Sequence, residues 1–154
     1  MSNLQKKDCL FCKIVQGIIP SSKIWEDKNY IAILDVFPNT KGMTLVIPKK
    51  HYDSYAFDMP DKSYSELLLV AKKVAKLLDK SLNVQRTAMV MEGTGINHVH
   101  IKLCPLHGLD KKFTETWSKE ERYFNTYQGY LSTILGPKAD PIELEKLAKT
   151  IRKK

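Results

Sequence analysis

Two histidines and a lysine occupy alternate positions of one short segment, His98-Val99-His100-Ile101-Lys102. Side chains alternate across a β-strand, so the three polar side chains should share one face and the two apolar ones the other. A histidine can act as a nucleophile, a proton shuttle or a metal ligand, and a lysine beside it can neutralise phosphate oxygens. This segment is therefore the leading candidate for a catalytic strand.

A glycine-rich turn, residues 92–97, leads directly into this strand. Gly93 and Gly95 would let backbone N–H groups approach a ligand closely, and successive N–H groups can bind an anion. The turn could also serve only to join two strands. Its position immediately before two histidines favours anion binding.

Three cysteines, an odd number, do not suit a disulfide framework. Cys9 and Cys12 form a C-x-x-C pair, whereas Cys104 stands alone. In a reducing compartment such a pair indicates metal or redox chemistry more often than a structural bridge. A redox protein is disfavoured because no βαβ pattern accompanies the pair.

The bulk composition indicates one soluble domain in the cytoplasm. The chain has 154 residues, of which 43% are hydrophobic and 27% charged, which suits a single core. No run approaches the roughly 20 apolar residues that span a bilayer, and residues 1–8 lack the apolar core of a secretory signal. The net charge of +8 is spread widely, without the basic and aromatic stripe of a nucleic-acid site. Neither DNA, RNA nor a membrane is therefore an expected partner.

Hydrophobic patterning predicts an α+β fold, an antiparallel sheet of about five strands with one main helix. The helix is predicted over residues 61–80, where apolar residues recur at helical spacing. Five segments have the composition of strands, namely residues 23–26, 30–36, 43–48, 86–92 and 98–104.

Residues 109–154 differ in character from residues 1–108 and are predicted to form a helical extension packed on the same domain. Ser118 could open a capping box, and Asp140 is a stronger helix start because a proline follows it. Aromatic residues of this extension could stack on a base or reach a dimer partner, but packing on the domain is the expectation. They are Trp117, Tyr123, Phe124, Tyr127 and Tyr130.

Four co-linear segments resemble those of the histidine-triad (HIT) superfamily. They are residues 9–20, 31–38, 41–51 and 98–102, the last of which resembles the signature H-x-H-x-H. The resemblance covers roughly residues 8–107 and points to the HINT-like branch with a C-x-x-C amino terminus. It implies a HIT-like fold, a homodimer and a pocket for purine nucleotides.

The resemblance further implies a nucleotide hydrolase or nucleotidyl transferase that acts at the α-phosphate. The middle signature histidine is the family's nucleophile, so that role falls on His100, which would form a covalent nucleotidyl-histidine. Covalent catalysis divides one hard displacement into two, and neutral imidazole is a competent nucleophile. The implied substrates are nucleoside phosphoramidates, acyl-adenylates or dinucleoside polyphosphates. The alternative is a catalytically weak, zinc-stabilised nucleotide-binding protein that regulates a partner.

The resemblance also assigns a nucleotide site. Asp35 falls at the acidic position that accepts hydrogen bonds from the ribose hydroxyls; its alternative role is that of a turn aspartate. Gly93, Gly95 and Asn97 fall in the turn before the signature. Six residues fall where the family lines the base pocket, although each could be core instead: Leu10, Phe11, Ile14, Ile33, Leu34 and Val36.

The chain departs from the family pattern at three places. Lys102 replaces the third signature histidine, Gly42-Met43 replaces a glycine-histidine pair, and residues 94–97 replace the usual Gly-Gln-Ser/Thr element. In the family, the third histidine and that Ser/Thr assist phosphate binding and the leaving group. A lysine stabilises charge but is a poor acid at neutral pH, which leaves the level of activity open.

Family members with the C-x-x-C pair imply a zinc site. Its ligands here would be Cys9, Cys12, His51 and His98, and two thiolates with two imidazoles are the tetrahedral set of a structural zinc. Such a site would hold the N-terminal segment against the sheet. The alternative is that both cysteines are free thiols and His51 is a surface residue. His107 is expected to be a turn histidine.

Overall fold

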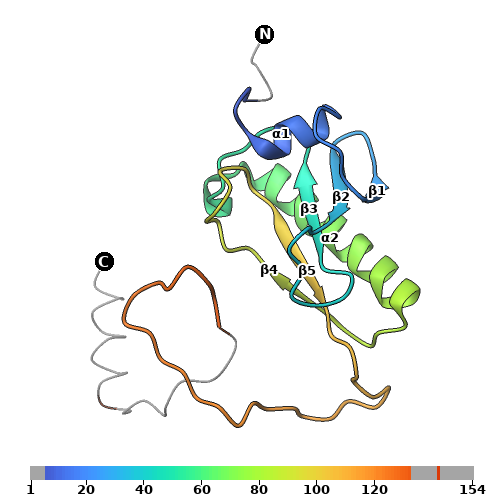
Figure 1. Ribbon diagram of the computed structural model, residues 1–154, viewed down its shortest axis with the longest axis vertical. Helices are drawn as coiled ribbons and strands as arrows, with labels where there is room; N and C mark the ends of the chain where they lie inside the picture. The colour runs from blue at the N-terminus through green and yellow to red at the C-terminus, as the bar shows by residue number, and fades with distance from the viewer. Residues whose placement is uncertain (1–5, 133–141, 143–154) are drawn as a thin grey trace. The chain divides into compact units, whose positions relative to one another are not determined.

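The computed structural model describes residues 6–132 and residue 142, and it shows a five-stranded antiparallel sheet with the strand order β1-β2-β3-β5-β4 (Figure 1). The strands are β1 (Lys23–Glu26), β2 (Tyr30–Leu34), β3 (Thr44–Pro48), β4 (Thr87–Val90) and β5 (Ile101–Pro105). The helices are α1 (Leu10–Val15), the 3-10 helix η1 (Ala56–Asp58) and α2 (Asp61–Leu82). The predicted α+β fold, with its five strands and one main helix, is confirmed.

The long helix α2 forms where the apolar spacing predicts it. Its buried residues lie three or four positions apart and so form one stripe, which packs on the sheet. The helix ends at Leu82, and the next residue, Asn83, adopts the left-handed conformation with φ 52°, a backbone state that asparagine tolerates better than most residues. The buried stripe consists of Leu67, Ala71, Val74 and Leu78.

The two faces of the sheet pack against different helices. Ala32 and Val46 belong to the core under α2, whereas Ile33 and Leu45 pack with Phe11 of α1. Successive strand residues point to opposite faces, so burial on both sides explains why β2 and β3 are almost continuously apolar. The helix α1 was not predicted, because six residues are too few to display a helical period.

The strand β5 begins three residues later than predicted. The predicted strand covered residues 98–104, but the ladder begins at Ile101. Before it, the His98 N–H donates to the Ile96 carbonyl (2.8 Å) and the Val99 N–H to the Tyr52 carbonyl (3.0 Å). The two signature histidines therefore lie on irregular backbone at the entry to the strand.

The chain divides into two compact units, residues 1–113 and 114–154. Residues 114–132 contain no helix or strand. The capping box predicted at Ser118 is wrong, because Ser118 Oγ accepts a hydrogen bond from the Glu120 N–H (3.0 Å), two residues on, and forms a turn. The helix predicted from Asp140 lies outside the described residues apart from Ile142, and the packing of residues 109–154 on the domain stays a prediction. Within the described ranges, no helix is long and apolar enough to span a bilayer.

Candidate functional site

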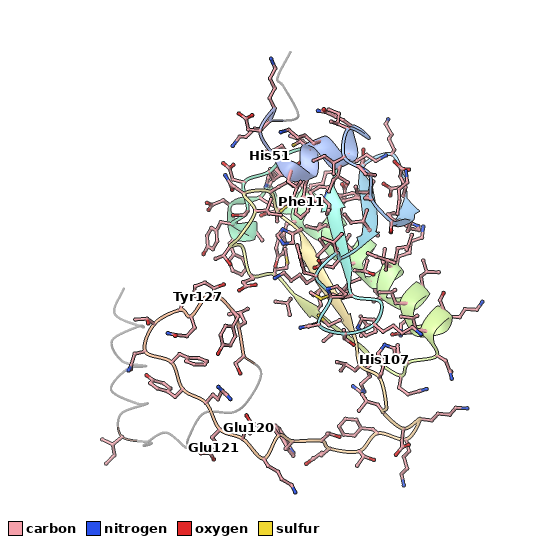
Figure 2. All side chains as sticks on the ribbon, viewed as in Figure 1. Phe11, His51, His107, Glu120, Glu121 and Tyr127 are labelled. Carbon is pink, nitrogen blue, oxygen red and sulfur yellow. The ribbon has the colours of Figure 1, made fainter. Side chains whose placement is uncertain are left out.

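Two cysteines and two histidines from three parts of the chain meet at one end of the sheet. Cys9 and Cys12 lie at the start of α1, His51 follows β3, and His98 precedes β5 (Figure 2 labels His51). The Nδ1 atom of His98 lies 3.3 Å from Cys9 Sγ and 3.6 Å from Cys12 Sγ, and Cys12 Sγ lies 3.4 Å from Nδ1 of His51. The four possible ligand atoms all lie within 4.8 Å of one another. We call these residues the Cys2His2 cluster.

Both imidazoles of the Cys2His2 cluster bond to an oxygen acceptor through Nε2 and face the sulfurs with Nδ1. The Nε2 atom of His98 lies 2.9 Å from the Pro48 carbonyl, and Nε2 of His51 lies 3.3 Å from Asp53 Oδ1. A carbonyl or carboxylate oxygen only accepts, so each Nε2 carries the proton and each Nδ1 presents a lone pair to the sulfurs. Metal-binding histidines commonly show this arrangement, with the second nitrogen bonded to an oxygen acceptor.

The chemistry of the Cys2His2 cluster suits a divalent metal. Burial lowers the pKa of His98 to about 4, so the ring is neutral at pH 7, as a ligand must be. Burial also raises the pKa of the Cys12 thiol, and a bound cation would offset that cost. Zinc bonds of about 2.3 Å to sulfur and 2.0 Å to nitrogen place tetrahedral S and N ligands about 3.5 Å apart. The observed sulfur–nitrogen separations of 3.3, 3.4 and 3.6 Å match that geometry.

Asp53 joins the Cys2His2 cluster to the glycine-rich turn, a role that the sequence did not reveal. Its Oδ1 accepts hydrogen bonds from Lys6 Nζ (2.7 Å) and Asn97 Nδ2 (3.0 Å) as well as from His51. The bond from Lys6 is the largest of several contacts that lower the pKa of Asp53. Asn97 also accepts a bond from the Ser54 N–H (2.8 Å), so its side chain braces the turn.

His100 has the opposite tautomer from His98. Its Nδ1 lies 2.8 Å from the His98 carbonyl, so Nδ1 carries the proton and Nε2 has the lone pair. Burial lowers the pKa of His100, which favours the neutral, nucleophilic ring. The rings of His100 and Phe11 make an edge-to-face contact, with their centroids 5.0 Å apart. His100 retains 9% exposure and lines a cavity.

That cavity, of about 500 Å³, contains most of the residues that the resemblance assigns to a nucleotide. Gly93 and Asn97 do not line it, because the Gly93 carbonyl accepts from Ser54 Oγ and Asn97 bonds to Asp53. Ser21, Asn39 and Met43 do line it and were missed. The assigned residues that line the cavity are Leu10, Phe11, Ile14, Ile33, Leu34, Asp35, Val36, Gly95, His100 and Lys102.

Asp35 combines the two roles that the sequence left open. Its Oδ1 accepts a hydrogen bond from the Phe37 N–H (2.9 Å), which makes it a turn aspartate. It also lines the cavity and is only half-buried. The turn therefore fixes the carboxylate at the cavity wall. His107, by contrast, is exposed, donates to the Lys41 carbonyl (2.8 Å), and does not line the cavity.

Lys102 forms an ion pair with a residue that the sequence marked only as the start of a turn. Its Nζ lies 2.9 Å from Glu92 Oε2. The Glu92 side chain is 11% exposed and the Lys102 side chain 30%. The Glu92 carboxylate is therefore nearly buried, while Lys102 lines the cavity that His100 also lines.

The fold and this arrangement of histidines define a histidine-triad protein. The HIT domain family matches residues 16–108, more than half of the chain, and the chain belongs to that family. The resemblance to the histidine-triad superfamily seen in the sequence is thereby confirmed, while the assignment to the HINT-like branch stays a prediction.

Individual relatives agree with this assignment. The adenosine 5′-monophosphoramidase HNT1 of Saccharomyces cerevisiae is 32% identical over 118 residues, which cover 76% of this chain and 74% of the relative. The crystal structure of SMU.412c from Streptococcus mutans UA159 has a TM-score of 0.70 and 32% identity, and the match covers 99% of this chain and 88% of that one. A zinc-bound histidine triad family protein from Mycobacterium smegmatis has a TM-score of 0.63 and 26% identity, over 96% of this chain and 98% of that one.

Proposed function

We propose that this protein is a nucleotide hydrolase or nucleotidyl transferase acting at the α-phosphate of purine nucleotide conjugates. His100 is the nucleophile, and the reaction passes through a covalent nucleotidyl-histidine that water then hydrolyses. The phosphoramidases among the relatives support a reaction at a nucleotide phosphate.

One observation carries this proposal, namely the state of the His100 ring beside the cavity. Because Nδ1 donates to the His98 carbonyl, the lone pair stands on Nε2, which a nucleophilic imidazole needs. Asp35 would accept hydrogen bonds from the ribose hydroxyls, the apolar lining would hold the base, and Lys102 would face the phosphate.

Trapping the intermediate tests the proposal. The wild-type protein is mixed with adenosine phosphoramidate or an acyl-adenylate, quenched in acid or base, digested and examined by mass spectrometry. We expect a nucleoside monophosphate adduct on the peptide that contains His100, and none in His100→Ala. Unchanged turnover in that variant would remove His100 as the nucleophile. Tight nucleotide binding without any adduct or turnover would instead favour the regulatory binding protein.

We also propose that the Cys2His2 cluster holds a structural zinc and that the protein is a cytoplasmic homodimer. The donor geometry and the zinc-bound relative support the metal, and the dimer is what membership of the family implies. Elemental analysis of protein purified without chelator should give one zinc per chain. Light scattering should give twice the mass of the chain.

A further inference from the structure

A second hollow adjoins the cavity that His100 lines. Its volume is about 660 Å³, and it is lined by residues 6–10, His51 and residues 95–97. We call it the N-terminal hollow. Ligand pockets have volumes of roughly 300 to 1,000 Å³, so the hollow and the cavity are each large enough to hold part of a substrate.

The N-terminal hollow is distinct from the metal position. Cys9 and His51 lie in its wall, whereas Cys12 and His98, which are completely buried, do not. The four possible ligand atoms lie within 4.8 Å of one another, a space that one metal ion would fill. The hollow therefore lies beside the Cys2His2 cluster and can take a ligand of its own.

The N-terminal hollow and the cavity share a wall made by Leu10, Gly95 and Ile96. Gly95 is exposed and has a φ of +78°. A Cβ atom built on Gly95 meets no atom within 4 Å outside the two neighbouring residues, so the backbone here borders open space. A ligand that is bound in the cavity can therefore continue across Gly95 into the hollow.

The leaving group is the part of a nucleotide conjugate that would take this path. In the proposed function, the apolar lining holds the base and Asp35 holds the ribose. Residues 94–96 also line the cavity, and they belong to the glycine-rich turn in which an anion is expected. The α-phosphate would then lie between His100 and this turn. Because the leaving group departs roughly in line with the attacking atom, it would lie on the far side of the phosphate, toward Gly95.

The lining of the N-terminal hollow indicates which kind of leaving group fits. It contains no Phe, Tyr or Trp, so a second base would have no aromatic surface on which to stack. Leu10 and Ile96 are its only large apolar side chains, too few to cover a long acyl chain. Most of the other side chains are polar or charged, among them Lys7 and Asp8. A peptide, with its N–H, carbonyl and charged groups, matches such a wall.

We propose that the N-terminal hollow is a subsite for the leaving group and that it selects nucleotide conjugates of a peptide amine over those of a small amine. Gly95 is a specificity-determining residue, because its bare backbone leaves the path between the cavity and the hollow open. This inference rests on the proposed function of His100.

The reaction balances with water as the only further reactant. When His100 Nε2 bonds to the α-phosphorus, the bond from phosphorus to the amine nitrogen breaks. The amine departs with the bonding electron pair and takes one proton from a water molecule. The hydroxide that remains bonds to phosphorus, the bond from phosphorus to the imidazole breaks, and His100 recovers its lone pair. The products are the peptide amine and a nucleoside monophosphate.

Two substrates with the same alkylamine at phosphorus test the subsite. They are the adenosine phosphoramidates of n-butylamine and of the lysine side chain in the tripeptide Gly-Lys-Gly. The ratio of kcat/KM for the peptide conjugate to kcat/KM for the butylamine conjugate should be about tenfold in wild type, the effect of one or two hydrogen bonds. Equal kcat/KM values for the two conjugates in wild type overturn the inference.

Gly95→Asn should bring this ratio to about one, because the new side chain would fill the space over the backbone. Asparagine tolerates a positive φ better than most residues. Gly108→Asn is the matched control, since Gly108 has a φ of +85°, also borders open space and lines neither the cavity nor the hollow. It should keep the wild-type ratio. A wild-type ratio in Gly95→Asn overturns the role of Gly95.

A binding measurement on the wild-type protein remains decisive if Gly95→Asn does not fold. Isotope-labelled protein is titrated with adenosine monophosphate and with a peptide conjugate in which a methylene group replaces the bridging nitrogen. Both ligands should shift the amide resonances of Phe11 and Ile33 in the cavity, and only the conjugate should shift those of Lys7 and Asp8. Conjugate shifts confined to the cavity overturn the inference, as do Lys7 and Asp8 shifts with the monophosphate alone. Absence of cavity shifts with both ligands, or of a His100 adduct, overturns the proposed function instead.

Discussion

His98 and His100 are two residues apart, yet they face different chemistry. His98 is completely buried, donates through Nε2 to the Pro48 carbonyl and offers Nδ1 to two sulfurs. His100 donates through Nδ1 to the His98 carbonyl and offers Nε2 beside the cavity. The position of one acceptor oxygen therefore separates a ring whose lone pair faces two sulfurs from a ring whose lone pair lies beside the cavity. Residue type alone does not fix the role of a histidine.

The sharpest way to break this comparison is to remove each ring in turn. If His100 is the nucleophile as proposed, His100→Ala should lower turnover by roughly 10⁴-fold, because it removes the group that would bond to phosphorus, while zinc content stays at wild-type level. His98→Ala should lose zinc. His107→Ala, which removes a histidine outside the cavity, should change neither. Zinc loss in His100→Ala would mean that the Cys2His2 cluster and the cavity are not independent of each other.

Removing the metal should produce the next largest effect, on stability. A ligand present at about 1000 times its Kd contributes about 4 kcal/mol to the folded state, which is about 10 °C in Tm for a chain of this size. Cys12→Ser, at a completely buried position, should lose zinc and show this loss of Tm in calorimetry. Cys104→Ser, which changes a half-buried cysteine outside the cluster, is the control. An equal Tm for zinc-loaded and chelator-treated wild type would contradict a structural metal.

Asp53→Asn should weaken zinc binding by the Cys2His2 cluster without replacing any of its four ligands. The amide cannot provide the charged acceptor that His51, Lys6 and Asn97 share, so zinc affinity should fall by about 10- to 100-fold in a chelator competition. Asp58, an exposed aspartate of η1, provides the control: Asp58→Asn should leave zinc affinity as it is. Equal affinity in both variants would exclude a role for Asp53 at the metal.

Phe11→Leu should have the smallest effect and should reach both regions. The Phe11 ring contacts His98 and His100, with centroids 5.9 and 5.0 Å away. Losing those edge contacts should cost about 1 kcal/mol of stability in denaturant unfolding. Zinc affinity and kcat/KM should each fall less than tenfold. Phe57→Leu, at an exposed position, is the control for the effect of a Phe to Leu change on stability, zinc affinity and kcat/KM. If Phe11→Leu lowers only zinc affinity or only kcat/KM, Phe11 does not link the Cys2His2 cluster to the cavity.

The sequence predicted those elements whose burial leaves a recognisable apolar pattern, either a continuous run or a helical spacing. Continuous apolar runs gave β2 and β3, and the spacing of Leu67, Ala71 and Val74 gave α2. The start of β5 was placed too early because side-chain alternation continues through His98 to His100, while the backbone N–H groups there bond outside the ladder. An alternating pattern of polar and apolar residues predicts which way the side chains point. It does not predict the hydrogen-bond partners of the backbone N–H groups.

The site was predictable in its motifs and not in its supporting contacts. The C-x-x-C pair and the alternating histidines are visible in the chain, and the four predicted ligands do lie together. Asp53 and Glu92 were not found, because their partners Asn97 and Lys102 are 44 and 10 residues away. No short-range pattern encodes such pairs. A carboxylate two residues after His51 was the one available hint.

The two oxygens that determine the ring states of His98 and His100 belong to peptide groups, of Pro48 and of His98 itself. Replacing a side chain does not delete a peptide oxygen. Substitutions can therefore accumulate around the cavity, including the replacement of an imidazole by an amine at position 102, while both proton positions persist. Side chains around the cavity can thus be exchanged by mutation without removing the acceptor that fixes either ring.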